Sequence, residues 1–288
     1  MASGLLAAAC SSGSGTGTAT STSSAAPSKA VSSIAAQVPA SVRSKGTLTV
    51  AADATYAPNE FIGSDGHTVV GMDADLAKAL GQVMGLKVNM VNATFDTIIP
   101  GIVSGKYDLG MSSFTDTKAR QQTVDFVTYF VAGTSFYVKS SGGPNITSLS
   151  DLCGHKVAVE KGTTQQSDVQ AQASKCKSAG KADISLQIFN DQNAVNLALS
   201  SGRADVAMAD SPVADYQVKK SGGTFKLSGQ PYGTAPYGIA MPKNNGMAKP
   251  VLAAMKALIA DGRYQKILDK WGIQAGAITK PVVNGATS

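Results

Sequence analysis

Residues 112–126, SSFTDTKARQQTVDF, gather small hydroxyl side chains directly ahead of Arg120. Four of the first six residues carry a hydroxyl group. One interpretation is a capped turn before a solvated helix, in which Ser, Thr and Asp satisfy free backbone donors. The other is a cradle for a carboxylate, with the guanidinium as a two-pronged donor. Because capped turns are common, the segment alone favours the first interpretation.

The elements around this segment alternate between strand-like and helix-like patterns. Short β-rich runs cover 47–53, 86–92 and 107–113, and apolar residues at helical spacing cover 73–85 and 95–105. This alternation predicts an α/β fold. The last of these strands runs directly into the hydroxyl-rich segment.

Two stretches of the chain resemble each other. SGKYDLGMSS (104–113) and SGRADVAMAD (201–210) share a Gly, a basic residue, an Asp and a Met at equal spacing, and each follows an apolar helical run. Similarly, TLTVAAD (47–53) has a counterpart in HKVAVEKGTT (155–164), where a strand again runs into polar residues. The agreement in order predicts two α/β lobes of like construction.

The predicted strands of both lobes end in polar residues. Ligands of open α/β sheets bind outside the carboxyl ends of the strands, so two facing lobes would bring these ends to one cleft. The cleft would contain one arginine, several hydroxyls and two carboxylates, which suits a zwitterion better than a nucleophile with its base. The strand-end residues are Asp53, Ser113, Thr115, Thr163, Thr164 and Asp210.

Length, charge and hydropathy limit the class of protein. With 288 residues the chain has room for two domains. The 25 Lys and Arg residues outnumber the 19 Asp and Glu residues, but they are scattered and form no basic stripe, which argues against nucleic acid as a partner. No apolar run approaches the roughly 20 residues of a membrane helix.

The first 44 residues differ in composition from the rest. LLAAAC ends at Cys10 and precedes a tract of small polar residues that cannot build a core. The pattern resembles the lipidation site of bacterial lipoproteins, with residues 1–10 as the remnant of a signal and 11–44 as a flexible tether. Position 7 is Ala where that site most often has Leu, and no basic residue precedes Cys10. The alternative is a free cysteine in a disordered N-terminus.

The other two cysteines, Cys153 and Cys176, have no CxxC spacing and no nearby pair of histidines, so we expect no metal site. In an exported chain they would most simply pair with each other, and this would stabilise the fold by roughly 3 kcal/mol. Two separate buried thiols are the alternative.

Several segments are similar to the family 3 extracellular solute-binding proteins, the amino-acid-binding subunits of ABC importers. The resemblance covers about residues 45–275 and is most specific over 95–130. The segments are DATYAPNEF, GMDADLAKAL, FDTIIPGIVSGKYDLGMSSFTDTKARQQTVDFVTYF, VAVEKGTTQ and GRADVAMADSP.

The resemblance implies a two-lobed α/β fold of the type II periplasmic-binding-protein kind, in which the chain crosses twice between lobes. The crossings would lie near 131–138 and 233–240. Lobe 1 would then comprise 46–133 with 237–288, and lobe 2 would comprise 134–236.

The resemblance also implies a ligand set. The guanidinium of Arg120 would hold the α-carboxylate of an amino acid, aided by the hydroxyl residues and the helix start at Thr163. Asp210 would accept from the α-ammonium, and Asp53 would reach the side chain between aromatic walls. Taken singly, the carboxylates could be turn formers, the aromatics core residues and Thr163 an N-cap. The full set is Asp53, Tyr56, Phe95, Ser113, Thr115, Arg120, Thr163 and Asp210.

These features predict a non-catalytic, monomeric receptor without cofactor or metal. It would be exported, held at the outer face of the cytoplasmic membrane through a lipid on Cys10, and would deliver its cargo to a permease and an ATPase. Because Asp53 would otherwise be buried without a cation, Gln, Asn, Arg, Lys and His are the candidate cargoes rather than Asp or Glu. The alternatives are a dehydratase-like enzyme on the same scaffold, with Glu160 and Lys161 as its acid or base, and a sensory module that docks on a separate receptor.

Overall fold

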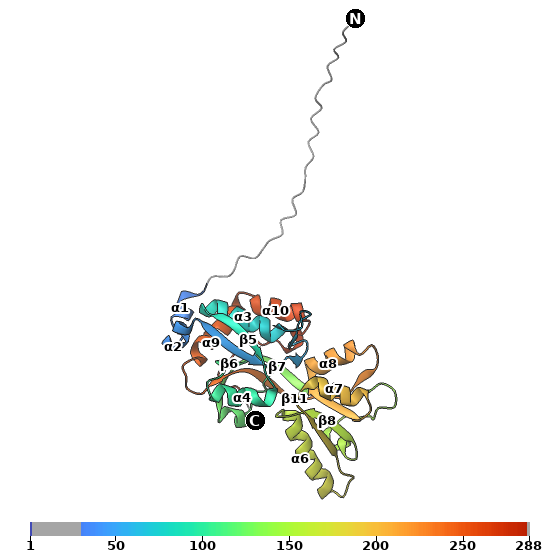
Figure 1. Ribbon diagram of the computed structural model, residues 1–288. Helices are drawn as coiled ribbons and strands as arrows, with labels where there is room; N and C mark the ends of the chain where they lie inside the picture. Colours follow the sequence, from blue (N-terminus) through green and yellow to red (C-terminus); the bar gives the residue numbers. More distant parts are fainter. Residues whose placement is uncertain (2–29, 287–288) are drawn as a thin grey trace.

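The computed structural model describes residue 1 and residues 30–286, and Figure 1 shows its two lobes. One large sheet runs through both. Its strands, in chain order, are β1 (Thr47–Ala52), β5 (Lys87–Asn92), β6 (Leu109–Gly110), β7 (Val124–Lys139), β8 (Lys156–Glu160), β9 (Ser185–Phe189), β10 (Val206–Asp210) and β11 (Phe225–Pro242). A small antiparallel sheet is formed by β2 (Thr55–Tyr56), β3 (Glu60–Ile62) and β4 (Val69–Val70).

Helices cover both lobes. The first lobe carries α1 (Ser32–Ala35), α2 (Ala40–Lys45), α3 (Met72–Met84), α4 (Phe95–Val103), α5 (Lys118–Gln121), α9 (Ala248–Ala260), α10 (Arg263–Trp271) and the 3-10 helix η2 (Gln274–Gly276). The second lobe carries the 3-10 helix η1 (Leu149–Leu152), α6 (Thr164–Ser178), α7 (Gln192–Ser200) and α8 (Ser211–Lys220). This mixed architecture confirms the predicted α/β class.

The order of the large sheet, β5-β1-β6-β11-β7-β10-β8-β9, repeats one design from both edges. β1 lies between β5 and β6 in a parallel trio, and β8 lies between β9 and β10 in another. The two similar decapeptides contain β6 and β10, which occupy equivalent places in the sheet. The sequence similarity therefore corresponds to a repeated structural unit.

The two lobes are joined by β7 and β11, which pair along nearly their whole length (Figure 1). The register of this pair shifts between Ser228 and Tyr232, between Tyr232 and Ala235, and between Tyr237 and Gly238. These irregularities fall within or beside the expected second crossing. Such interruptions let a strand pair bend, so they suit the position between lobes.

Apolar residues form a core in each lobe. The first core packs α3, α9 and α10 against the sheet through Leu80, Met255 and Leu268, all at most 1% exposed. The second packs α6 against β8 through Val169 and Val159, both fully buried. Among the described residues, no helix is both long and apolar enough to cross a membrane.

The end of the expected tether is helical. Residues 32–35 and 40–45 form α1 and α2, and Ile34 and Val38 are 8% and 2% exposed within the core of the first lobe. This differs from the expected tether over 11–44, because two apolar side chains four residues apart find a surface on α3 and α9 that composition does not reveal. Cys10 and residues 11–29 lie outside the described residues.

The disulfide prediction is confirmed, since Cys153 and Cys176 are bonded to each other. The bond fastens the segment after η1 to the last turn of α6 within the second lobe. The predicted strand over 107–113 is shorter than expected. It ends at Gly110, although the amide of Met111 still donates to the carbonyl of Ala51 at 3.0 Å. Ser113 then turns the chain with a positive φ of 50°.

Candidate functional site

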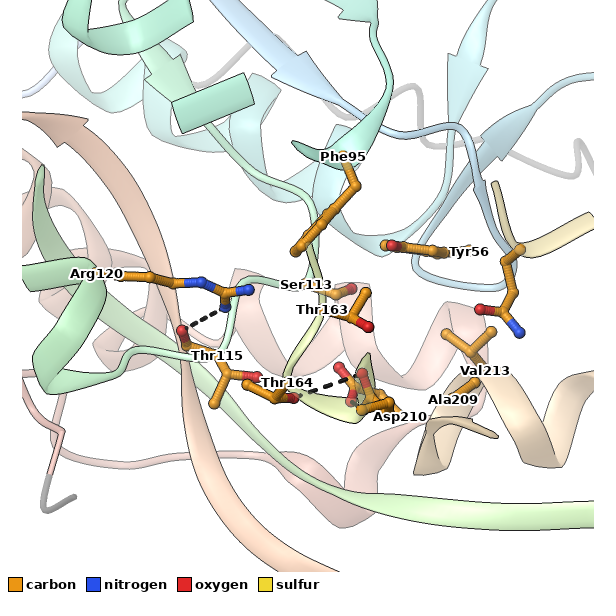
Figure 2. A pocket seen from close by; sticks show the side chains of 12 residues that line it. Tyr56, Phe95, Ser113, Thr115, Arg120, Thr163, Thr164, Ala209, Asp210 and Val213 are labelled. Carbon is orange, nitrogen blue, oxygen red and sulfur yellow. Dashed lines mark hydrogen bonds between the residues drawn. The ribbon is translucent and has the colours of Figure 1, made fainter. Parts of the chain in front are cut away.

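A cavity lies between the lobes. Its lining comes largely from the starts of helices, because each strand of a parallel unit leads into a helix at the same edge of the sheet. Figure 2 shows Phe95 and Tyr56 on one side, with Thr163, Thr164 and Asp210 facing them. The lining residues are Tyr56, Phe95, Ser113, Thr115, Arg120, Thr163, Thr164, Gln165, Gln192, Ala209, Asp210 and Val213.

Seven of the eight residues predicted to bind a ligand line this cavity. Asp53 does not, since it lies behind the wall with 3% of its surface exposed. Its carboxylate accepts hydrogen bonds from the Thr55 hydroxyl at 2.6 Å and from the Phe95 amide at 3.0 Å. Asp53 therefore fixes the start of α4 and leaves Phe95 as the surface of the cavity.

Arg120 is held in place from both lobes. Its Nη1 donates to the Thr115 carbonyl at 2.8 Å, and its Nη2 donates to the Gly162 carbonyl at 3.0 Å (Figure 2 draws the first bond). The guanidinium carbon lies 5.3 Å from the ring centre of Phe95 and 5.4 Å from that of Phe114. These contacts fix the plane of the guanidinium.

The hydroxyl-rich segment is a capped helix start, as its first interpretation stated. The Thr117 hydroxyl accepts from the amide of Arg120 at 3.2 Å, so it caps α5. Thr163 similarly caps α6 by accepting from the Gln166 amide at 3.2 Å. Capping and a place on the cavity wall coexist, because Arg120 and Thr163 are lining residues as well.

Asp210 provides the acidic side of the cavity at the start of α8. Its carboxylate accepts from Gln165 Nε2 at 2.6 Å and from the Tyr237 hydroxyl at 2.7 Å. Burial raises the pKa of Asp210, whereas these two hydrogen bonds and the charge of Arg120 lower that pKa. The acid and the guanidinium thus face one cavity without forming an ion pair of their own.

A second acidic group comes from the end of β8. Glu160 is 1% exposed, and neither of its carboxyl oxygens has a hydrogen-bond partner. The hydroxyl of Tyr56, which is also buried, interacts with this carboxyl group. Burial, followed by the charge of Asp53, raises the pKa of Glu160 to about 10. Glu160 from lobe 2 and Asp53 from lobe 1 therefore form a buried acidic pair that keeps a proton at neutral pH.

Further contacts join the lobes beside the cavity. Lys161 Nζ lies 2.8 Å from a carboxylate oxygen of Asp96, and the amide of Gln192 donates to the Thr55 hydroxyl at 3.1 Å. Gly162 has a φ of +80°, and a Cβ there would lie 3.0 Å from the Cβ of Asp96. The interface at this point leaves no room for a side chain.

Three polar residues of the site were not predicted: Gln165 and Gln192, which line the cavity, and Tyr237, which supports Asp210. Thr164, which was expected at the cleft as a strand-end residue, lines the cavity. Gln165 follows the predicted Thr163 by two positions, and a helix start at that point could have indicated it. Gln192 opens α7 directly after its N-cap, Asp191. In residues 30–286, no group of three or more His, Cys, Asp or Glu side chains is placed to hold a metal ion.

Two α/β lobes joined by paired strands and enclosing a small polar cavity define a two-lobed solute-binding protein. The chain belongs to the bacterial extracellular solute-binding proteins, family 3, whose family model matches residues 48–274.

Its relatives include proteins with named amino-acid ligands. The arginine-binding protein ArgT of Corynebacterium glutamicum is 32% identical over 255 residues, which are 88% of this chain and 83% of ArgT. The structure of an ancestral arginine-binding protein bound to arginine is 37% identical with a TM-score of 0.73, covering 78% of this chain and 98% of that chain. An ancestral arginine-binding protein bound to glutamine is 37% identical with a TM-score of 0.72, covering 79% and 98%.

Proposed function

We propose that this protein captures an amino acid with a cationic side chain, arginine above all, between its two lobes and delivers it to an ABC importer. The observation that carries the proposal is the buried acidic pair of Asp53 and Glu160, whose pKa values no cation within residues 30–286 lowers. The names of the relatives, which include arginine-binding proteins, support the same class of ligand.

The backbone groups of an amino acid fit the two charged walls of the cavity. Arg120 would use the N–H groups that its two bonds to backbone carbonyls leave free to form a bidentate pair with the α-carboxylate. Ser113, Thr115 and Thr163 would complete the carboxylate shell. Asp210, already fixed by Gln165 and Tyr237, would accept from the α-ammonium.

The side chain of the ligand would then extend past Tyr56 and Phe95 toward the acidic pair. Two carboxyl groups beyond the zwitterion cannot both ionise in a buried site without a cation. A guanidinium or ammonium group would replace the proton on Glu160 and supply donors to its unpartnered oxygens. A carboxylate side chain would add a further negative charge, so glutamate and aspartate should be excluded.

Isothermal titration calorimetry with arginine, citrulline, glutamine and glutamate tests this proposal. Citrulline has the shape of arginine without its charge, so we expect it to bind at least about tenfold more weakly, given the cost of an uncompensated buried charge. Glu160→Gln should reduce this discrimination. Asp168→Asn serves as a control, because Asp168 is bonded to the Tyr232 hydroxyl at 2.8 Å outside the cavity. Equal affinities for arginine and citrulline would contradict a cationic subsite.

The same titrations distinguish a receptor from an enzyme on this scaffold. The protonated carboxyl group of Glu160 could act as a general acid. The ligand should therefore be recovered after incubation with the protein and analysed by mass spectrometry. We expect it unchanged. A product with a different mass would favour the enzyme.

The remaining proposals concern the setting of the protein. We propose lobe boundaries of 46–133 with 237–288 and 134–236, a monomer in solution, and an anchor through a lipid on Cys10. The family is extracellular, which supports an outer face of the membrane as the location.

Palmitate labelling of the wild type and of Cys10→Ser in a bacterial host tests the lipid anchor, and light scattering tests the monomeric state. Equal labelling of both proteins would exclude lipidation at Cys10.

A further inference from the structure

A second buried acidic pair, Glu60 and Asp73, lies in the first lobe away from the acidic pair described above. Glu60 is part of β3 and Asp73 is in the first turn of α3, and both are 0% exposed. One carboxyl oxygen of each residue accepts a hydrogen bond from Ser113. The Ser113 hydroxyl donates to Glu60 Oε2 at 3.2 Å, and the Ser113 amide donates to Asp73 Oδ2 at 3.0 Å.

Ser113 needs such support. Its φ of 50° is in the left-handed region, which is unfavourable for a residue with a Cβ. It also lines the amino-acid cavity, and its hydroxyl accepts from Asn59 Nδ2 at 2.9 Å. The conformation of Ser113 therefore depends on groups that contact no ligand.

The other two oxygens of the pair, Glu60 Oε1 and Asp73 Oδ1, have no hydrogen-bond partner. Two adjacent buried carboxylates would both be left with uncompensated charge, whereas one proton between them satisfies both free oxygens. We propose that Glu60 and Asp73 share one proton, and that this hydrogen-bonded carboxyl pair holds Ser113 in its left-handed conformation at the wall of the amino-acid cavity.

The surroundings of the pair favour a single proton. The titratable groups that face it are Asp53, Tyr56, Tyr129 and Tyr237, and each of them is negative when ionised. Burial, followed by the charge of Asp73, raises the pKa of Glu60 well above its ordinary range. Burial raises the pKa of Asp73 to about 6, while the Ser113 amide and the Tyr129 hydroxyl, 2.9 Å away, oppose that rise. Both shifts favour a proton on the pair, and Glu60 shows the larger rise.

The direct test is infrared spectroscopy of the unliganded protein. The spectrum of the wild type minus that of Glu60→Gln at pH 7.5 should contain the carbonyl stretch of a protonated carboxylic acid. The protonated Glu160 is present in both proteins and cancels. A difference spectrum with only ionised carboxylate bands would overturn the shared proton, whatever ligand the protein binds.

The positioning role rests on the proposed function, since its readout is arginine affinity. Glu60→Gln keeps a donor to Asp73 and an acceptor for Ser113, so it should bind arginine within about threefold of wild type. Glu60→Met has a similar volume and neither group, so its affinity should fall at least about tenfold, the effect of leaving buried polar groups unpaired. Wild-type affinity in Glu60→Met would overturn the role of the pair. If the wild type itself does not bind arginine, this result counts against the proposed function alone. The infrared measurement tests separately whether Glu60 and Asp73 share a proton.

If Glu60→Met does not fold, the pH dependence of Glu60→Gln decides. As the shared proton leaves above neutral pH, the arginine affinity of the wild type should fall relative to that of Glu60→Gln, which cannot titrate at this position. The ratio of the two affinities cancels the titration of the ligand. A ratio that is constant from pH 7 to pH 10 would contradict the proposal.

Discussion

Arg120 in the first lobe donates a hydrogen bond of 3.0 Å from Nη2 to the carbonyl oxygen of Gly162 in the second. The guanidinium is therefore a contact between lobes as well as a wall of the cavity. A group that bridges the lobes in this way can couple ligand binding to their closure, because only the closed arrangement brings both partners within reach.

Replacing Arg120 tests this double role. Arg120→Lys keeps the charge and loses the planar fork, so we expect at least a tenfold loss of arginine affinity, about 1.5–3 kcal/mol for a charge-assisted bond. Arg120→Ala should abolish measurable binding. Calorimetry gives the affinities, and circular dichroism checks the fold. Retained affinity in Arg120→Ala would show that the α-carboxylate is bound elsewhere.

The pKa of Glu160 predicts a pH dependence of stability without ligand. The folded protein holds this proton up to a pKa of about 10, whereas the unfolded chain releases it near the ordinary value of 4.5. The unfolded state then binds fewer protons, so this group lowers the free energy of unfolding as pH rises between these values. Glu160→Gln should gain melting temperature over the wild type as pH rises from 5 to 9. A constant difference would contradict a retained proton.

Arginine binding should release that proton. A cation beside Glu160 favours its ionised form, so binding at pH 8 should release up to one proton, and arginine affinity should rise with pH below the pKa of the ligand's ammonium group. Calorimetry in two buffers with different ionisation enthalpies measures the release. Glu160→Gln should release less. An equal release by both proteins would assign it to another group.

Removing the disulfide should destabilise the second lobe and spare the site. Cys153 and Cys176 enclose a short loop, for which the chain-entropy model gives about 3 kcal/mol. The double substitution of both cysteines by Ser should lower the free energy of unfolding by roughly that amount. Neither cysteine lines the cavity, so arginine affinity at 25 °C should change by less than about twofold. Unchanged stability would show that the bond adds nothing.

The helices α1 and α2 should contribute to the stability of the first lobe. A chain that begins at residue 46 loses the buried Ile34 and Val38, each worth about 1.5–3 kcal/mol on the hydrophobic scale, relative to a chain that begins at residue 30. Urea unfolding of the two chains measures the difference. Ile34→Ala in the longer chain is the matched control, and equal midpoints for all three would show that this packing does not matter.

Most residues that line the cavity could be predicted from the sequence, but the buried residues that hold them in place could not. Arg120, Thr163 and Asp210 follow strands at points where parallel units place polar residues, so pattern and resemblance located them. The pairing of Glu60 with Asp73, and of Asp53 with Glu160, depends on contacts between elements far apart in the chain. The burial of Ile34 and Val38 was missed for a related reason, since composition describes a segment without the surface it meets.

The core of the first lobe depends on residues that are synthesised late. The first lobe needs Ile239 from β11 and Met255 and Leu268 from the last helices for its core. Synthesis proceeds from the N-terminus, so the whole of the proposed second lobe, 134–236, has been made before these residues exist. The second lobe is therefore complete in sequence while the first still lacks part of its core.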